Sequence, residues 1–161
     1  MKKTHHYRNK IIWTGNTGSS TKNYRSYERI YTISVEGKAD LNGSSDPAFL
    51  GNPKLHNPED LLLASVSSCH LLWYLHLCSV HHILVEEYTD YAEGVMEEQE
   101  NGSGRFTDIV LKPKIRVAQQ DMVEKALELH HTAGEYCFIA NSLNVKVRHE
   151  PEITFGTASD L

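Results

Sequence analysis

Two cysteines, Cys69 and Cys137, are the residues of this chain whose type and setting could do chemistry. Cys69 lies in a long apolar segment, flanked by serines and by His70, and Cys137 comes shortly after Gly134. A thiol is a nucleophile only as the thiolate, so it needs a nearby cation or hydrogen-bond donors. Two thiols brought together could interconvert with a disulfide. Packing as small core residues is the alternative that both positions also allow.

The remaining cysteine, Cys78, follows Cys69 by nine residues in the same apolar segment. Nine residues amount to about two and a half turns of an ideal helix, so the two side chains face opposite ways. Cys78 and Cys69 therefore cannot pair while both are helical, and we expect Cys78 to be structural.

Histidine is abundant, with ten residues, and this invites a metal-site interpretation. The candidate ligands are His70, His76, His81, His82, His130 and His131. None of the usual ligand spacings, such as HExxH or CxxC, occurs, so we expect no metal site and no metal cofactor.

Length and composition favour one soluble globular domain over residues 1–161, with 40% hydrophobic and 23% charged residues. The net charge of −5 argues against a nucleic-acid partner. The N-terminal segment is polar rather than apolar, which favours a cytoplasmic protein. The apolar run from Leu61 to Val80 is long enough for a membrane span, but its serines and histidines favour a buried central helix and no membrane partner.

The elements that must position these residues can be read from hydrophobic periodicity. Strands are expected at 7–13 and 24–35, the second with Arg25 and Arg29 on its apolar face, followed by a loop over 37–53. Asn57 and Pro58 then mark the N-cap and first residue of a helix that reaches about Val80 and is apolar nearly all round. Such a helix is usually enclosed by other structure.

The second half of the chain begins with two expected strands, at 83–97 and 106–117, joined by a hairpin tip at 98–104. A helix over 119–132 is expected to stop at Gly134. A short turn at 137–142 and a strand at 143–149 follow. Together these elements predict an α+β domain.

The segment from Asn57 to His70, NPEDLLLASVSSCH, resembles the signature of the OsmC/Ohr family. In that signature the reactive cysteine lies ten residues after the glutamate, an interval that Glu59 and Cys69 keep. A second similarity is a helix followed by a cysteine and a short turn before a strand, here CFIANSL from Cys137. The similarity covers about residues 7–155.

The resemblance implies an α+β fold that forms an intertwined homodimer, with long central helices wrapped by antiparallel sheets. It also implies a thiol-dependent peroxidase. The Cys69 thiolate would attack an organic hydroperoxide and become a sulfenic acid, and Cys137 would resolve it to a disulfide. An external dithiol reductant would restore both thiols, and no other cofactor is implied.

Family members stabilise the thiolate with an arginine held by the glutamate, which corresponds to Glu59 here. Arg29 is our choice for the arginine and Arg25 the second choice; an ordinary structural ion pair is the alternative. In an unbroken helix Glu59 and Cys69 lie about 15 Å apart along the axis. One arginine could bridge both only if Glu59 folded back or the helix began later than Pro58.

Some residues depart from the family pattern. Phe138 stands where many members have a proline after the second cysteine, and His70 and Trp73 replace small or apolar residues of the Ohr branch. These departures leave a second function open, that of a stress-associated binding protein with little peroxidase activity.

Overall fold

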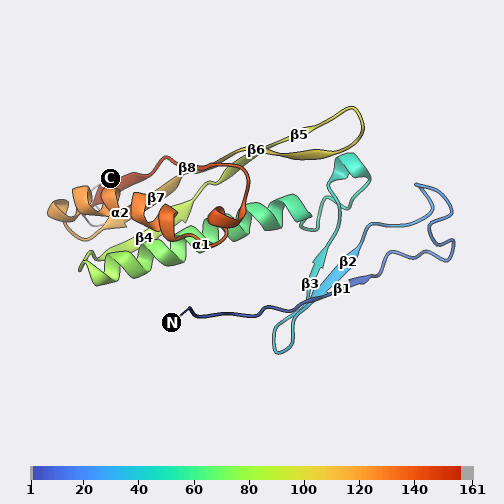
Figure 1. Cartoon of the computed structure of the whole chain (residues 1–161), viewed down its shortest axis with the longest axis horizontal. Coiled ribbons are helices and arrows are strands. Elements are labelled where there is room, and N and C mark those ends of the chain that lie inside the picture. The colour runs from blue at the N-terminus through green and yellow to red at the C-terminus, as the bar shows by residue number, and fades with distance from the viewer. Residues whose placement is uncertain (1, 157–161) are drawn as a thin grey trace. The chain divides into compact units, whose positions relative to one another are not determined.

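The structure is a computed structural model that describes residues 2–156 (Figure 1). It contains both helices and strands, so the predicted α+β class is confirmed. The chain divides into two compact units between Leu62 and Leu63, inside its first long helix.

The first unit contains one antiparallel sheet in the order β1-β2-β3. Its strands are β1 (Lys10–Trp13), β2 (Tyr31–Ser34) and β3 (Leu41–Gly43), followed by the 3₁₀ turn η1 (Pro47–Phe49). The predicted strand 24–35 is wrong over its first half, and the predicted loop 37–53 contains β3 and η1. The backbone N–H of Ser26 donates to the carbonyl of Asn23, and Arg29 donates to the carbonyl of Tyr27. These local bonds compete with strand pairing.

Helix α1 (Pro58–Val80) begins where the sequence predicts. The Asn57 side chain accepts from the Asp60 N–H at 2.7 Å, and the Asp60 carboxylate accepts from the Asn57 N–H at 3.2 Å. This reciprocal cap satisfies two donors that a helix start leaves unpaired. The start at Pro58 is therefore confirmed by hydrogen bonds as well as by pattern.

Within one chain α1 is not enclosed on all sides, contrary to the prediction. Its buried residues are Val66, His70, Tyr74, Leu77 and Cys78, whereas Leu72 is 67% exposed. By length and composition α1 could cross a membrane, but the core helix of a soluble protein passes the same test. Only 28% of its most apolar stretch is buried inside the chain. Much of the apolar surface of α1 is thus left for something else to cover.

The second unit contains six strands. They are β4 (Val85–Asp90), β5 (Glu93–Glu98), β6 (Gly104–Leu111), β7 (Pro113–Val117), β8 (Val147–His149) and β9 (Glu152–Phe155). Each of the two long predicted strands, 83–97 and 106–117, is therefore divided in two. At the division the Lys112 N–H donates to the Asp90 carboxylate at 2.8 Å, and Pro113 has no N–H to donate.

These strands form two sheets, in the orders β4-β7-β9 and β5-β6-β8. The pairs β4–β7 and β5–β6 are antiparallel, as expected, but β8 and β9 each join their sheet in parallel. Figure 1 shows β5 and β6 as a long hairpin whose tip lies at the predicted place.

Helix α2 (Val123–Tyr136) follows the 3₁₀ turn η2 (Gln120–Met122) and does not stop at Gly134, contrary to the prediction. Gly134 has a packing role instead, because a Cβ at this position would lie 2.7 Å from Cε1 of His149. One core joins α1, α2 and β7. Its buried residues are Tyr74, Leu77, Cys78, Ile115, Val117, Ala126, Leu129 and Ala133.

Alanine in place of Gly134 is expected to destabilise the protein by about 1–3 kcal/mol, because the added methyl group overpacks the contact with His149. An unobstructed helical site would instead gain about 1 kcal/mol from the same change. Urea unfolding of Gly134→Ala, in the natural background and with His149→Ala, measures both values. Stabilisation by Gly134→Ala with His149 intact would contradict this packing role.

Candidate active site

Cys69 and Cys137 lie side by side within the second unit. Cys69 is half-buried on α1, and Cys137 is the residue after the last turn of α2, 1% exposed. Both thiols are free, and they lie close enough for Cys69 to raise the pKa of the Cys137 thiol. The structure thus brings together the two cysteines that the resemblance pairs.

Local structure around Cys137 holds its sulfur in place. α2 ends there because Cys137 is extended, with φ −66° and ψ 105°, and the chain then turns through η3 (Ala140–Ser142). The Ala140 N–H donates to Cys137 Sγ at 3.5 Å, and Sγ lies 3.9 Å from the carbonyl oxygen of Val66 on α1. The predicted turn at 137–142 is confirmed, and it fixes the thiol against α1.

Burial keeps the Cys137 thiol in its protonated form. It raises the pKa of this thiol to about 11, and Cys69 adds to the rise. The Ala140 N–H opposes it. Cys137 is therefore protonated at neutral pH, and its S–H donates to the carbonyl oxygen of Val66 at 3.9 Å.

Cys78 lies apart from this pair, in the core. It is 1% exposed, and burial raises the pKa of its thiol. Its neighbour is the Tyr74 side chain, whose own pKa is raised by burial and by Cys78. The structural role expected for Cys78 agrees with this position.

Arg29 and Glu59, both in the first unit, are not joined by an ion pair within residues 2–156. The guanidinium of Arg29 donates to the carbonyls of Tyr24 and Tyr27, and it lies 4.3 Å from the centre of each ring. Arg25, the second choice, is exposed. The roles of these arginines in thiolate stabilisation stay predictions.

Glu59 keeps one carboxylate oxygen, Oε2, buried without a hydrogen-bond partner. Burial raises the pKa of Tyr31, and the charge of Glu59 raises it further. Because α1 begins at Pro58 and is unbroken, a later helix start is excluded as the way for one arginine to reach both Glu59 and Cys69.

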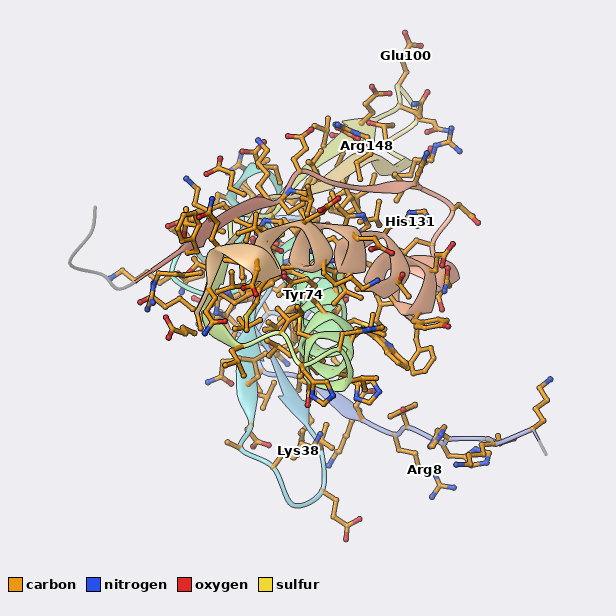
Figure 2. The ribbon with its side chains drawn as sticks, turned by 90° about the vertical axis from the view of Figure 1, so that its left-hand side faces the viewer. Arg8, Lys38, Tyr74, Glu100, His131 and Arg148 are labelled. Carbon is orange, nitrogen blue, oxygen red and sulfur yellow. The ribbon has the colours of Figure 1, made fainter. Side chains whose placement is uncertain are left out.

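Sequence reasoning missed a column of aromatic rings beside the thiols. Its members are Tyr74, His130, His70 and His149, in that order. Ring centres lie 3.9 Å apart for Tyr74 and His130 and 4.3 Å for His70 and His149. Figure 2 shows Tyr74 in the interior of this unit. The signal was present in the sequence, since His130 falls on the apolar stripe of α2 with Ala126, Leu129 and Ala133.

The centre of this column is a pair of buried histidines. His70 Nε2 and His130 Nδ1 are 3.0 Å apart and share one hydrogen bond. The other nitrogens, His70 Nδ1 and His130 Nε2, are buried without a protein partner. Burial, and then the neighbouring histidines, lowers the pKa of each ring to about 3. Both are therefore neutral at physiological pH.

The structure offers no metal site in residues 2–156, where no group of three His, Cys, Asp or Glu side chains is arranged to hold an ion. In the histidine pair the two free nitrogens are on opposite sides of the shared bond, which prevents them from binding one ion together. A surface hollow of about 500 Å³ between α2 and β8, lined by His131, Lys146 and His149 among others, contains neither Cys69 nor Cys137. We therefore place the candidate site at the thiols.

Comparison with known proteins shows which solved structures share this fold. The chain resembles an OsmC-like protein of unknown function from Vibrio cholerae, with 27% identity, a TM-score of 0.83 and coverage of 92% of this chain and 100% of that one. An organic hydroperoxide resistance protein from Elizabethkingia anophelis has 18% identity and a TM-score of 0.70, with coverage of 97% and 100%.

A Legionella pneumophila organic hydroperoxide resistance protein gives 16% identity and a TM-score of 0.65, with coverage of 95% and 99%. The search among curated proteins found no match. Residues 51–151, which include Cys69 and Cys137, match the family described as OsmC-like protein. The chain therefore belongs to the OsmC-like family.

Proposed function

We propose that this protein is a cytoplasmic, thiol-dependent peroxidase that reduces organic hydroperoxides and acts as a homodimer. The observation that supports it most is the close approach of two free thiols, Cys69 and Cys137, of which burial keeps Cys137 protonated. The half-buried Cys69 can be reached by a small oxidant, whereas Cys137 is almost fully covered. This difference in exposure supports Cys69 as the attacking thiol and Cys137 as the resolving thiol.

The proposed reaction has three steps. The Cys69 thiolate attacks the terminal oxygen of R–OOH, the O–O bond breaks, and the alkoxide takes a proton to leave as R–OH with Cys69 as a sulfenic acid. The Cys137 sulfur then displaces hydroxide from the Cys69 sulfur; with the Cys137 proton this leaves as water, and a disulfide forms. An external dithiol exchanges with that disulfide, returns both thiols and is itself oxidised.

A second copy of the chain would cover the apolar surface of α1 that is exposed in a single copy. The apolar face of α1 includes Leu72, 67% exposed, and Leu75, 37% exposed. Exposed apolar surface of this extent on a long helix marks an interaction face. The unpaired Oε2 of Glu59 likewise lacks the donor that a buried carboxylate needs.

The test is native and peptide mass spectrometry of the reduced full-length protein, before and after one equivalent of cumene hydroperoxide. We expect a dimer whose subunits each lose two hydrogens, with the new disulfide mapped to Cys69 and Cys137. Cys78 should remain a thiol. Unchanged thiols would reject the peroxidase, and a monomeric mass would reject the homodimer.

One observation favours the alternative, an OsmC-like binding protein with little peroxidase activity. Within one chain Arg29 contacts Tyr24 and Tyr27 rather than Glu59, so the cation expected to support a thiolate is engaged elsewhere. Rates of alkylation by iodoacetamide across pH separate the two functions. A Cys69 that reacts as a thiolate well below pH 8 supports the peroxidase, and an unreactive Cys69 supports the binding protein.

A further inference from the structure

Three aromatic residues of the second unit are close neighbours of the two cysteines along the chain or on the same helix face. Trp73 follows Cys69 by four residues on α1, so the two share a helix face. Tyr136 and Phe138 are the chain neighbours of Cys137. The ring of Trp73 lies 5.2 Å from that of Tyr136 and 5.5 Å from that of Phe138, centre to centre. We call these three residues the aromatic cluster.

Two members of the aromatic cluster are open to solvent. Phe138 is 66% and Tyr136 49% exposed, whereas Trp73 packs its other side against the core. Phe138 meets Trp73 edge to face at 86°, and Tyr136 is tilted at 50° to it. The exposed surface of Phe138 and Tyr136 is available to a further aromatic ring, and edge-to-face contact is an arrangement that aromatic groups prefer.

The aromatic cluster has no lysine or arginine among its ring contacts in residues 2–156. Within residues 2–156, the ring contacts of Trp73 are to the other two members and to His76, at 5.8 Å. The nearby Glu135 is engaged with His131 at 3.4 Å. No ammonium or guanidinium group is recorded against these rings in the described part of the chain, so a carboxylate-bearing substrate finds no counter-charge here.

We propose that the aromatic cluster makes this protein selective for uncharged hydroperoxides that carry an aryl group. The aryl ring packs on Trp73, Tyr136 and Phe138 while the peroxide oxygen meets Cys69. This inference rests on the proposed peroxidase function and adds its substrate class. Stacking adds to simple apolar burial, and it corresponds to about a 2- to 12-fold preference over a saturated ring of the same size.

The test compares kcat/KM of the full-length protein, with excess dithiol, for three hydroperoxides. Cumene hydroperoxide carries an aryl ring, p-menthane hydroperoxide a saturated ring, and tert-butyl hydroperoxide no ring. We expect cumene hydroperoxide to be favoured over p-menthane hydroperoxide by about 3-fold or more. Phe138→Leu and Trp73→Leu should bring that ratio close to one. Tyr91→Leu, which removes an aromatic ring that is 59% exposed elsewhere on this unit, should leave the ratio unchanged.

The outcomes of this test separate the aryl selectivity from the peroxidase function on which it rests. If none of the three peroxides is consumed, the peroxidase function fails and the selectivity with it. If all are consumed with a cumene to p-menthane ratio near one, only the selectivity is overturned. Phe138→Leu could instead weaken subunit association without changing the ratio; the cluster would then be a subunit contact. Because Phe138 is largely exposed, this variant tests the idea even if Trp73→Leu fails to fold.

Discussion

Serine in place of Cys69 is expected to abolish peroxide consumption, with a loss of about a thousandfold or more in kcat/KM. A serine hydroxyl does not ionise near neutral pH, and its oxygen cannot pass through the sulfenic acid and disulfide states. The Cys137 thiol would then lie beside an oxygen with no redox chemistry. Steady-state consumption of cumene hydroperoxide with excess dithiol measures the effect.

The other two cysteines supply the matched controls for this variant. Cys137→Ser should reduce about one equivalent of peroxide and stop, because the Cys69 sulfenic acid has no resolving thiol and proceeds to irreversible oxidation. Cys78→Ser should keep turnover, since Cys78 lies in the core beside Tyr74 and away from the pair. Loss of turnover in Cys78→Ser with normal folding, or full activity in Cys69→Ser, would mean that the reactive thiol has been misassigned.

The start of α1 and the contact of the two cysteines were predictable from sequence for different reasons. Asn57 and Asp60 form a cap whose hydrogen bonds are local, so four neighbouring residues suffice to predict it. The contact of Cys69 with Cys137 joins residues far apart in the chain, and only the family resemblance pointed to it. Neither composition nor periodicity indicates which residues that are far apart in the sequence lie close together in the fold.

Arg29 and Gly134 show where sequence reasoning failed. Alternation of polar and apolar residues placed Arg29 in a strand, but it lies outside any strand, two residues before β2, with its side chain held by local hydrogen bonds and two tyrosine rings. Gly134 looked like a helix stop, but it is small because His149 approaches α2. In both cases a side-chain contact overrides the backbone preference of the residue, and such contacts cannot be derived from a pattern.

The histidine pair connects the stability of the fold with the geometry of the site. His70 follows Cys69 on α1, and His130 lies two turns before Cys137 on α2. Their hydrogen bond therefore joins the same two helices that present the two thiols. A proton added to either ring would introduce a charge at the centre of this contact, between Tyr74 and His149.

Acidification from pH 7.5 to 5 is expected to destabilise the protein by about 4 kcal/mol through His70 and His130, about 2 kcal/mol for each. Both rings have a folded-state pKa of about 3, whereas an unfolded histidine titrates near 6.5. The unfolded state therefore binds more protons between these values. The stabilisation is complete above about pH 6.5 and is lost as the pH falls toward 3.

Urea midpoints followed by circular dichroism at pH 7.5 and 5 measure this loss, and at pH 5 carboxylates with ordinary or lowered pKa values are still ionised. His149 adds to the effect, because burial lowers its pKa against the opposing charge of Asp90. The double variant His70→Leu/His130→Leu should remove most of the difference between the two pH values, whatever its absolute stability. His131→Gln, an exposed neighbour on α2, should leave that difference unchanged. Equal midpoints at both pH values in the natural protein would show that these rings are hydrated or charged in the fold. The contact between α1 and α2 would then not depend on two neutral imidazoles.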